Sequence, residues 1–311
     1  MESLGREREG KIWAVAGGKG GTGKTFIISS IGTYLARKGN KVILADFDYG
    51  AANLHSFLGV TRPKKSLTQF IEMGASLSDL ITKTDIENIS LITGDIHSIA
   101  SDSIRFSQKL KLFRQIMKLN SQYILIDLGA GSHNNTIDTF LIADKMITVL
   151  VPELIAIENM YHFLKNVYFR KIKMSLRDYG FKEIVQHIWE RREKYGIKNL
   201  KDLVDYLMDS FSYIGNILER ELANFKVYLI MNMVRSDQDI SLGYAIKSVL
   251  KKFLGINSQY AGYIEYDDCV WRSIRDNKPF MVYFGLSRCA KEIETFTLNL
   301  IQEKEVTLLR G

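Results

Sequence analysis

The chain has few of the residues that mark secreted, metal-rich or membrane-spanning proteins. Only two of its 311 residues are cysteines, Cys269 and Cys289, and they lack the close spacing of a metal-binding pair. Such a pair provides neither a disulfide framework nor an iron–sulfur ligand set, so we expect both thiols to be reduced. No run of eighteen apolar residues occurs, and this absence excludes an ordinary membrane-spanning helix.

Proline is also rare, and no signal sequence is visible. The chain has three prolines, no internal repeat and no low-complexity tract, which argues against long flexible linkers. The first ten residues are highly charged and lack an apolar signal core, so a cytoplasmic location is expected. Hydrophobic residues make up 46% of the sequence, enough for a buried core. We predict a single domain over residues 1–311.

The charge balance is mildly basic. The formal net charge is +7, which is compatible with nucleic acid, with an anionic membrane surface, or with neither. No basic motif interleaved with aromatic residues stands out. Specific recognition of nucleic acid is therefore not expected.

Seven short apolar segments are predicted to be β-strands. They are rich in Ile, Val and Leu, which is typical of strands covered by helices on both faces. Helical patterns separate most of them, so we predict the α/β class with a doubly wound, mostly parallel sheet. The segments are residues 12–16, 42–45, 89–92, 123–126, 146–151, 227–231 and 260–264.

One stretch, about residues 165–224, interrupts this alternation. Roughly eighty residues separate Pro152 from Asn232, which is more than an ordinary crossover needs. Apolar residues recur within it at helical spacing, and Asn199 is a candidate cap for a helix that begins at Leu200. We predict a helical insertion of two or three helices, which either covers the core or binds a partner.

A glycine-rich loop follows the first predicted strand and precedes a helix-like stretch that begins near Phe26. This order of strand, loop and helix is the context that a phosphate-binding loop requires. Glycines allow backbone N–H groups to line a cup, and the start of the following helix favours an anion there. The loop consists of Gly18, Lys19, Gly20, Gly21, Thr22, Gly23, Lys24 and Thr25.

Three side chains of this loop suit phosphate chemistry. Lys24 can reach the β- and γ-phosphates of a nucleotide, and the Thr25 hydroxyl can ligate Mg²⁺. A plain phosphate loop does not require Lys19. We predict that Lys19 points toward the nucleotide of a facing subunit, and the alternative is a solvated surface lysine.

Three further motifs follow predicted strands that lie far apart in the sequence. Because the carboxyl ends of parallel strands meet at one edge of a sheet, we expect these motifs to share one crevice with the glycine loop. They are Asp46 to Asp48, Asp127 to Gly131, and Pro152 with Glu153.

Together, these segments resemble the MinD/ParA ATPases with their deviant Walker A motif. The resemblance rests first on the loop from Lys19 to Thr25. Residues 46–54 are similar to the switch I segment of this family. Residues 127–131 are similar to its Walker B aspartate and switch II loop. Residues 149–153 resemble the strand and turn that follow. Residues 262–267 and 275–280 look most like the FlhG/FleN branch, the MinD-like regulators of flagellar number.

The resemblance implies a P-loop ATPase that uses ATP and Mg²⁺. The phosphates would be held by the loop amides and by Lys24, with Gly131 approaching the γ-phosphate. Asp48 would orient the attacking water, and Asn232 would recognise adenine. The residues assigned to the metal site, either as ligands or in its outer shell, are Thr25, Asp46 and Asp127.

The resemblance further implies a switch that forms a homodimer around ATP. It would regulate the positioning or number of a cellular structure, with slow hydrolysis stimulated by a protein partner. In such relatives a C-terminal helix can contact the membrane. Here residues 287–302 read as a terminal helix, and we predict that it packs against the sheet instead.

Two other functions remain as alternatives. A ParA-like partition ATPase that binds non-specific DNA is compatible with the charge of +7. An amidoligase of the same superfamily would need a nucleophilic cysteine. Neither Cys269 nor Cys289 lies in a nucleophile-elbow context, which argues against that reading.

Overall fold

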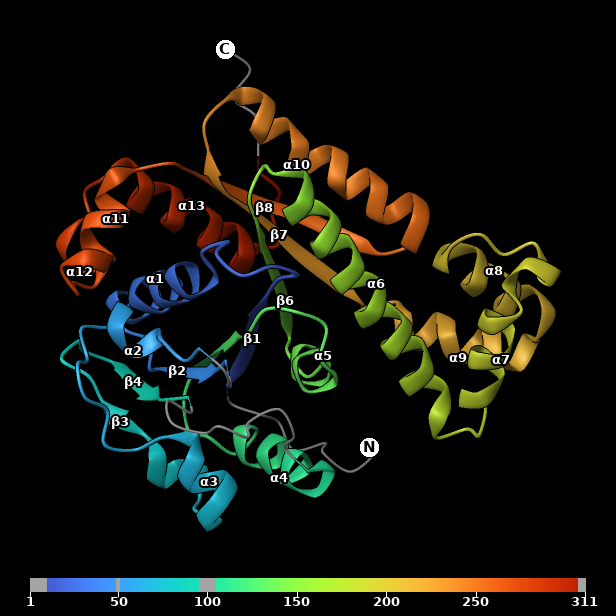
Figure 1. Ribbon diagram of the computed structural model, residues 1–311, viewed down its shortest axis with the longest axis horizontal. Helices are drawn as coiled ribbons and strands as arrows, with labels where there is room; N and C mark the ends of the chain where they lie inside the picture. The colour runs from blue at the N-terminus through green and yellow to red at the C-terminus, as the bar shows by residue number, and fades with distance from the viewer. Residues whose placement is uncertain (1–9, 49–50, 95–104, 307–311) are drawn as a thin grey trace.

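A mostly parallel β-sheet forms the centre of the computed structural model, which describes residues 10–48, 51–94 and 105–306 (Figure 1). The charged N-terminal segment and two residues of the predicted switch I segment, Tyr49 and Gly50, lie outside the described residues.

The sheet has eight strands in the order β3-β4-β2-β5-β1-β6-β7-β8. All seven predicted strands are present, and only β3 was not predicted. It has two residues and pairs antiparallel to β4, so it is too short to leave a pattern in the sequence. The strands are β1 (Lys11–Ala16), β2 (Val42–Phe47), β3 (Thr82–Lys83), β4 (Ile89–Ile92), β5 (Tyr123–Leu128), β6 (Lys145–Leu150), β7 (Lys226–Val234) and β8 (Asn257–Glu265).

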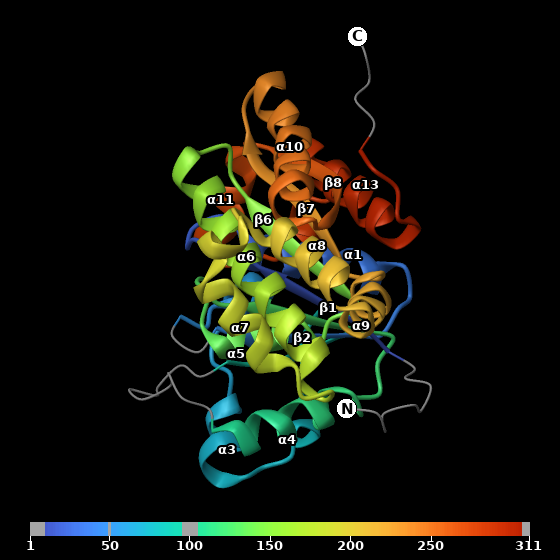
Figure 2. The same cartoon turned by 90° about the vertical axis from the view of Figure 1, so that its right-hand side faces the viewer.

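Helices cover both faces of this sheet, which explains why its strands are apolar along their whole length (Figures 1 and 2). Along β1, Ile12 and Ala14 join one core, and Trp13 and Val15 join the other. The second core lies under α1 (Lys24–Arg37), α2 (Leu54–Phe57), α12 (Phe280–Tyr283) and α13 (Arg288–Gln302). The first lies under α3 (Leu67–Met73), α4 (Phe106–Ile116), α5 (Asn134–Phe140), α6 (Leu154–Arg177) and α10 (Asp237–Val249).

Beyond α6, the chain forms three further helices on one side of the molecule (Figure 1). We call α7 (Lys182–Glu190), α8 (Leu200–Ser210) and α9 (Ser212–Leu222) the helical appendix. Its apolar residues, such as Ile188 and Leu203, are buried and extend the first core. The predicted cap is confirmed, because the Asn199 side chain accepts a hydrogen bond from the Asp202 N–H at 3.0 Å.

The terminal helix α13 packs against the sheet, as predicted. Ile293, Phe296 and Leu300 are buried. Gly262 of β8 permits this close approach, because a Cβ atom there would lie 2.5 Å from the Phe296 Cβ. Within the three described ranges, no helix is both long and apolar enough to cross a membrane.

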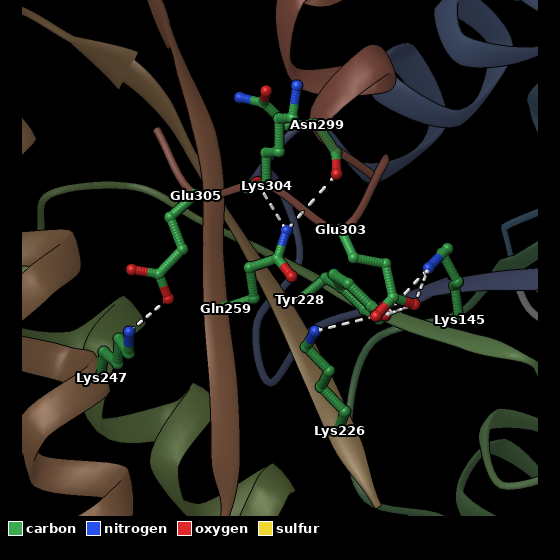
Figure 3. Close-up of polar contacts among 9 residues, drawn as sticks. All are labelled: Lys145, Lys226, Tyr228, Lys247, Gln259, Asn299, Glu303, Lys304 and Glu305. Atoms are coloured by element: carbon green, nitrogen blue, oxygen red, sulfur yellow. Dashed lines mark hydrogen bonds and ion pairs between the residues drawn. The ribbon is translucent and has the colours of Figure 1, made fainter. Parts of the chain in front are cut away.

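Glu303, directly after α13, joins the helix to the starting ends of β6 and β7 (Figure 3). Its carboxylate accepts hydrogen bonds from Lys145 at 2.8 Å, from the Tyr228 hydroxyl at 3.0 Å and from Lys226 at 3.3 Å. Lys145 is only 9% exposed, and Glu303 is its one carboxylate partner among the described residues. The carboxylate thus compensates a buried ammonium.

The residues after Glu303 extend this contact toward β8 and α10. The Gln259 amide donates to the Lys304 carbonyl at 2.6 Å, and Glu305 pairs with Lys247. The Val306 N–H donates to the Tyr260 carbonyl at 2.9 Å. The segment 303–306 therefore holds α13 against the edge of the sheet.

Replacing Glu303 with glutamine should destabilise the protein at neutral pH. Glu303→Gln leaves the buried Lys145 ammonium without a carboxylate, and we expect the free energy of unfolding to fall by about 1–3 kcal/mol in urea titrations. Hydrogen bonds from Lys145, Tyr228 and Lys226 hold the pKa of Glu303 at about 2, below its ordinary 4.5. The stabilisation is therefore complete above pH 4.5 and is lost as the pH falls toward 2.

The matched control is Glu305→Gln, because its partner Lys247 is solvent-accessible. Its effect should be about 0.5 kcal/mol or less. Equal stability of Glu303→Gln and wild type at pH 7 would contradict this account, as would an undiminished difference at pH 2.

Candidate functional site

The glycine loop lies between β1 and α1 at the carboxyl edge of the sheet, as predicted. Gly21 and Gly23 have φ values of 78° and 89°, in the left-handed region that favours glycine. Gly23 is also the N-cap of α1, so the first free N–H groups of that helix face the cup of the loop. This arrangement suits an anion.

The start of the loop lies directly on the backbone of α6. A Cβ atom at Gly18 would lie 2.0 Å from the Asn159 carbonyl oxygen and 2.7 Å from the Met160 nitrogen. Only glycine allows this approach, so the contact fixes the loop against a helix that is distant in the sequence. Nothing in the local sequence indicated it.

The two lysines of the loop point in different directions. Lys24 is 8% exposed, and its ammonium donates to the Lys19 carbonyl at 3.2 Å. Burial lowers its pKa, although Asp127 and Asp48 act in the opposite direction. The Lys19 side chain lies outside the cup and pairs with Glu153 at 3.2 Å. The Pro152–Glu153 turn was predicted from the sequence, but this ion pair was not.

Asp46 organises the chain that follows β2. Its side chain is fully buried, and its two oxygens accept hydrogen bonds from the Asp48 and Leu54 N–H groups, both at 3.0 Å. Burial raises its pKa to about 6, although these hydrogen bonds act to lower it. Because both oxygens are engaged, the geometry suits a supporting role more than direct contact with a metal ion.

Asp127 lies beside Asp46, because the two residues are register partners on β5 and β2. Burial and the neighbouring Asp46 raise its pKa well above the ordinary value, although a Thr25 hydrogen bond and Lys24 act in the opposite direction. The Asp127 Oδ1 atom is buried and has no hydrogen-bond partner among the described residues. This carboxylate oxygen and the neighbouring Thr25 hydroxyl are oxygen ligands of the kind that Mg²⁺ prefers. Water molecules would complete the coordination of such an ion.

Asp48 brings the switch I and switch II segments together. It accepts a hydrogen bond from the Ala51 N–H at 3.2 Å. A Cβ atom at Gly129 would lie 2.8 Å from the Asp48 Oδ1 atom, so the carboxylate lies directly over the backbone there. Gly131, with a φ of 97°, donates its N–H to the Gly17 carbonyl at 3.4 Å. The segments after β1, β2 and β5 thus meet, as expected.

Asn232, at the carboxyl end of β7, lies directly against the glycine loop. Its side-chain amide donates to the Thr22 carbonyl at 2.9 Å, and it is 4% exposed. A Cβ atom at Gly23 would lie 2.3 Å from this amide nitrogen. The structure therefore shows Asn232 as a support of the loop, and its predicted contact with a base stays a prediction.

A cavity of about 650 Å³ opens from the loop toward α11 (Asp268–Arg275). Its lining also includes Phe57, Tyr266 and Trp271, none of which was predicted as a site residue. Tyr266 and Trp271 are 49% and 58% exposed. Their exposure distinguishes them from ordinary core aromatic residues, and exposure cannot be read from a sequence. The predicted residues that line the cavity are Gly20, Gly21, Gly23, Lys24, Thr25, Asp48 and Asn232.

The remaining titratable groups do not suggest another chemistry. In the part of the chain that the structure describes, no three His, Cys, Asp or Glu side chains come together to hold a metal ion. Both cysteines are free thiols, and burial raises the pKa of Cys289. A high thiol pKa disfavours a nucleophilic thiolate.

Comparison with known proteins identifies relatives of this arrangement. A family model described as the CobQ/CobB/MinD/ParA nucleotide binding domain matches residues 13–280. The antiactivator FleN of Pseudomonas aeruginosa is 24% identical over 293 residues, which covers 93% of this chain and 86% of FleN. The sporulation initiation inhibitor Soj of Bacillus subtilis is 26% identical over 208 residues, covering 64% and 81%.

Solved structures share the fold. The cell division ATPase MinD of Pyrococcus furiosus has a TM-score of 0.60 at 21% identity and covers 94% of this chain and 99% of its own. MinD of Pyrococcus horikoshii, complexed with Mg-ADP, has a TM-score of 0.59 at 21% identity, covering 93% and 95%. FleN and Soj are similar to this chain at comparable identity, so the comparisons establish a family rather than one branch of it.

The contact between the loop and α6 can be tested with one added methyl group. Gly18→Ala places a Cβ atom into the α6 backbone, and we expect the free energy of unfolding to fall by about 1–3 kcal/mol in urea titrations without ligand. The control is Gly20→Ala, because a Cβ atom at Gly20 would have no described residue within 4 Å apart from its chain neighbours. Its effect should stay within about 0.5 kcal/mol. Equal stability of the two variants would show that α6 does not restrict the loop.

Proposed function

The chain belongs to the CobQ/CobB/MinD/ParA nucleotide-binding family, and from this premise we propose that it is an ATPase that forms a dimer around ATP and Mg²⁺ and resets on hydrolysis. The observation that carries the proposal is the buried Asp127 oxygen, which has no hydrogen-bond partner among the described residues, beside Thr25 and a glycine loop that lines a cavity. A nucleoside triphosphate would supply negative charge for the Lys24 ammonium, and Mg²⁺ would supply positive charge for the Asp127 carboxylate.

Different residues of the cavity would contact the phosphates and the base of the nucleotide. The loop N–H groups, the start of α1 and the Lys24 ammonium would hold the β- and γ-phosphates. Thr25 and Asp127 would hold the magnesium ion, with Asp46 fixing the loop beside it, and the bound ion would neutralise charge on the phosphates. The aromatic wall at Tyr266 and Trp271 suits the flat face of a base.

Hydrolysis then requires a positioned water and a further cation. Asp48 lies at the meeting point of switch I and switch II, where it would orient the attacking water. The ion pair of Lys19 with Glu153 keeps the Lys19 ammonium outside its own cup. This position supports a role of Lys19 at the nucleotide of a second subunit.

The cellular role that we favour is that of an FlhG-like regulator of flagellar number. The similarity to FleN over 93% of the chain supports it, as do the segments 262–267 and 275–280. The second candidate is a ParA-like partition ATPase, supported by the similarity to Soj and by the net charge of +7. ATP-dependent binding to non-specific duplex DNA that weakens steeply with salt would favour the second candidate.

The role of Lys19 predicts a dimerisation defect without a loss of ATP binding. Lys19→Ala should remain a monomer with Mg²⁺–ATP in light-scattering measurements, because it removes the cation that contacts the second nucleotide. Binding of a fluorescent ATP analogue should stay within about threefold of wild type. The control is Lys118→Ala, an exposed lysine just before β5 at the opposite edge of the sheet. A Lys19→Ala chain that dimerises normally would remove this residue from the interface.

The role of Asp48 predicts the complementary defect. Asp48→Ala should bind ATP and dimerise but hydrolyse ATP about 10²–10⁴ times more slowly, because the attacking water loses its orienting carboxylate. Phosphate release under saturating Mg²⁺–ATP measures this change. Turnover within about threefold of wild type would exclude Asp48 from the mechanism.

A further inference from the structure

The junction between α6 and the helical appendix concentrates the positive charge of the chain. Residues 165–198 contain ten lysine and arginine residues but four aspartate and glutamate residues. This excess of six accounts for nearly all of the net charge of +7. The rest of the chain is therefore almost balanced, and the basic character noted in the sequence belongs to one stretch of the chain.

Among the described residues, several of these cations have no carboxylate partner. Arg170 pairs with Asp138, Lys171 with Glu221 and Arg177 with Asp178. Within the described ranges, no ion pair involves Lys182 or Lys194.

Lys173 lies close to other cations of this stretch. Burial lowers its pKa, and the nearby Lys182 and Arg170 lower it further, although Glu183 and Glu190 act in the opposite direction. Cations that repel one another at a partly exposed surface favour an anionic ligand.

Aromatic rings lie next to these cations. Tyr213 of α9 contacts Tyr179 and Phe181 in the turn between α6 and α7, with ring centroids 6.2 and 5.9 Å apart. Tyr213 is 58% exposed, and the neighbouring Phe211 is 39% exposed. The Arg220 guanidinium donates to the Tyr179 hydroxyl at 2.6 Å. We call these five residues the appendix tip.

The composition of the tip distinguishes between anionic partners. Exposed Tyr together with Arg is typical of the residues that dominate protein–protein binding. Four carboxylates lie among the cations of residues 165–198, where they would repel a continuous phosphate backbone. The apolar face of α7, with Val185 and Ile188, is buried in the appendix and cannot enter a bilayer.

We propose that the appendix tip, with the adjoining Lys173 and Lys182, is a docking surface for an acidic segment of a partner protein that also carries aromatic or apolar side chains. The acidic side chains would meet the cations at the junction of α6 and α7, and the apolar ones would pack on Tyr213 and Phe211. This inference rests on the proposed function, because it assigns the chemistry of the partner that such a switch requires.

A copolymer of glutamate and tyrosine in a 4:1 ratio tests this inference on the full chain. We expect the fluorescein-labelled copolymer to bind, by fluorescence anisotropy at 0.1 M salt, about tenfold more tightly than poly-glutamate of equal length. It should also bind about tenfold more tightly than a 24-base-pair DNA duplex or phosphatidylglycerol vesicles. Tighter binding to the duplex or to the vesicles would overturn the proposal.

Paired variants locate the binding surface. The double variant Tyr213→Ala with Lys182→Ala should weaken copolymer binding about tenfold or more. The matched control is Tyr283→Ala with Lys278→Ala on the other side of the sheet, where an exposed tyrosine lies 5.5 Å from a lysine, measured from ring centroid to ammonium. It should stay within about twofold of wild type. Equal effects of the two pairs would overturn the proposal.

Binding of the ATP analogue, measured in parallel, separates the two conclusions. A chain that binds the analogue but not the copolymer refutes the docking surface and leaves the nucleotide site intact. A chain that binds the copolymer at the tip but not the analogue refutes the proposed function and leaves a surface for acidic protein segments.

Discussion

The burial of unlike charges at the carboxyl edge of the sheet is the constraint on which the site depends. Lys24, Asp46 and Asp127 lie close together and are nearly removed from water. Burial lowers the pKa of the lysine and raises those of both carboxyls, so the charged forms of all three are under-compensated. In the proposed complex, a triphosphate would provide an anion for Lys24, and Mg²⁺ would provide a cation for Asp127. The site would then gain favourable interactions on binding that the protein alone cannot supply.

A single helix connects this site to the helical appendix. The N-cap of α6 is Glu153, which pairs with Lys19, and the backbone at Asn159 touches Gly18. Farther along, Arg170 binds both oxygens of Asp138 on α5, the helix that follows switch II. A helix of 24 residues spans about 36 Å, so α6 contacts two segments of the site and still extends to the appendix.

Features that leave a local pattern in the sequence were predictable, and contacts between distant positions were not. Strands buried on both faces are continuously apolar, and glycine spacing marks a phosphate loop, so the sheet and the predicted cup were found. The two-residue β3 was too short to show periodicity. The pairing of Lys19 with Glu153 joins residues 134 positions apart, and that of Lys145 with Glu303 joins residues 158 apart. Such pairings, like the exposed Trp271 on the cavity wall, depend on the packing of the whole chain.

Isothermal titration of the folded protein with ATP in the presence of Mg²⁺ measures directly whether the buried charges bind a nucleotide. We predict saturable heat at one nucleotide per chain, reduced when Mg²⁺ is chelated. We also predict that Lys24→Ala, which removes the buried cation, lowers the affinity at least about tenfold. Absence of heat from ATP with well-folded protein, or equal affinity in Lys24→Ala, would contradict the proposed nucleotide site.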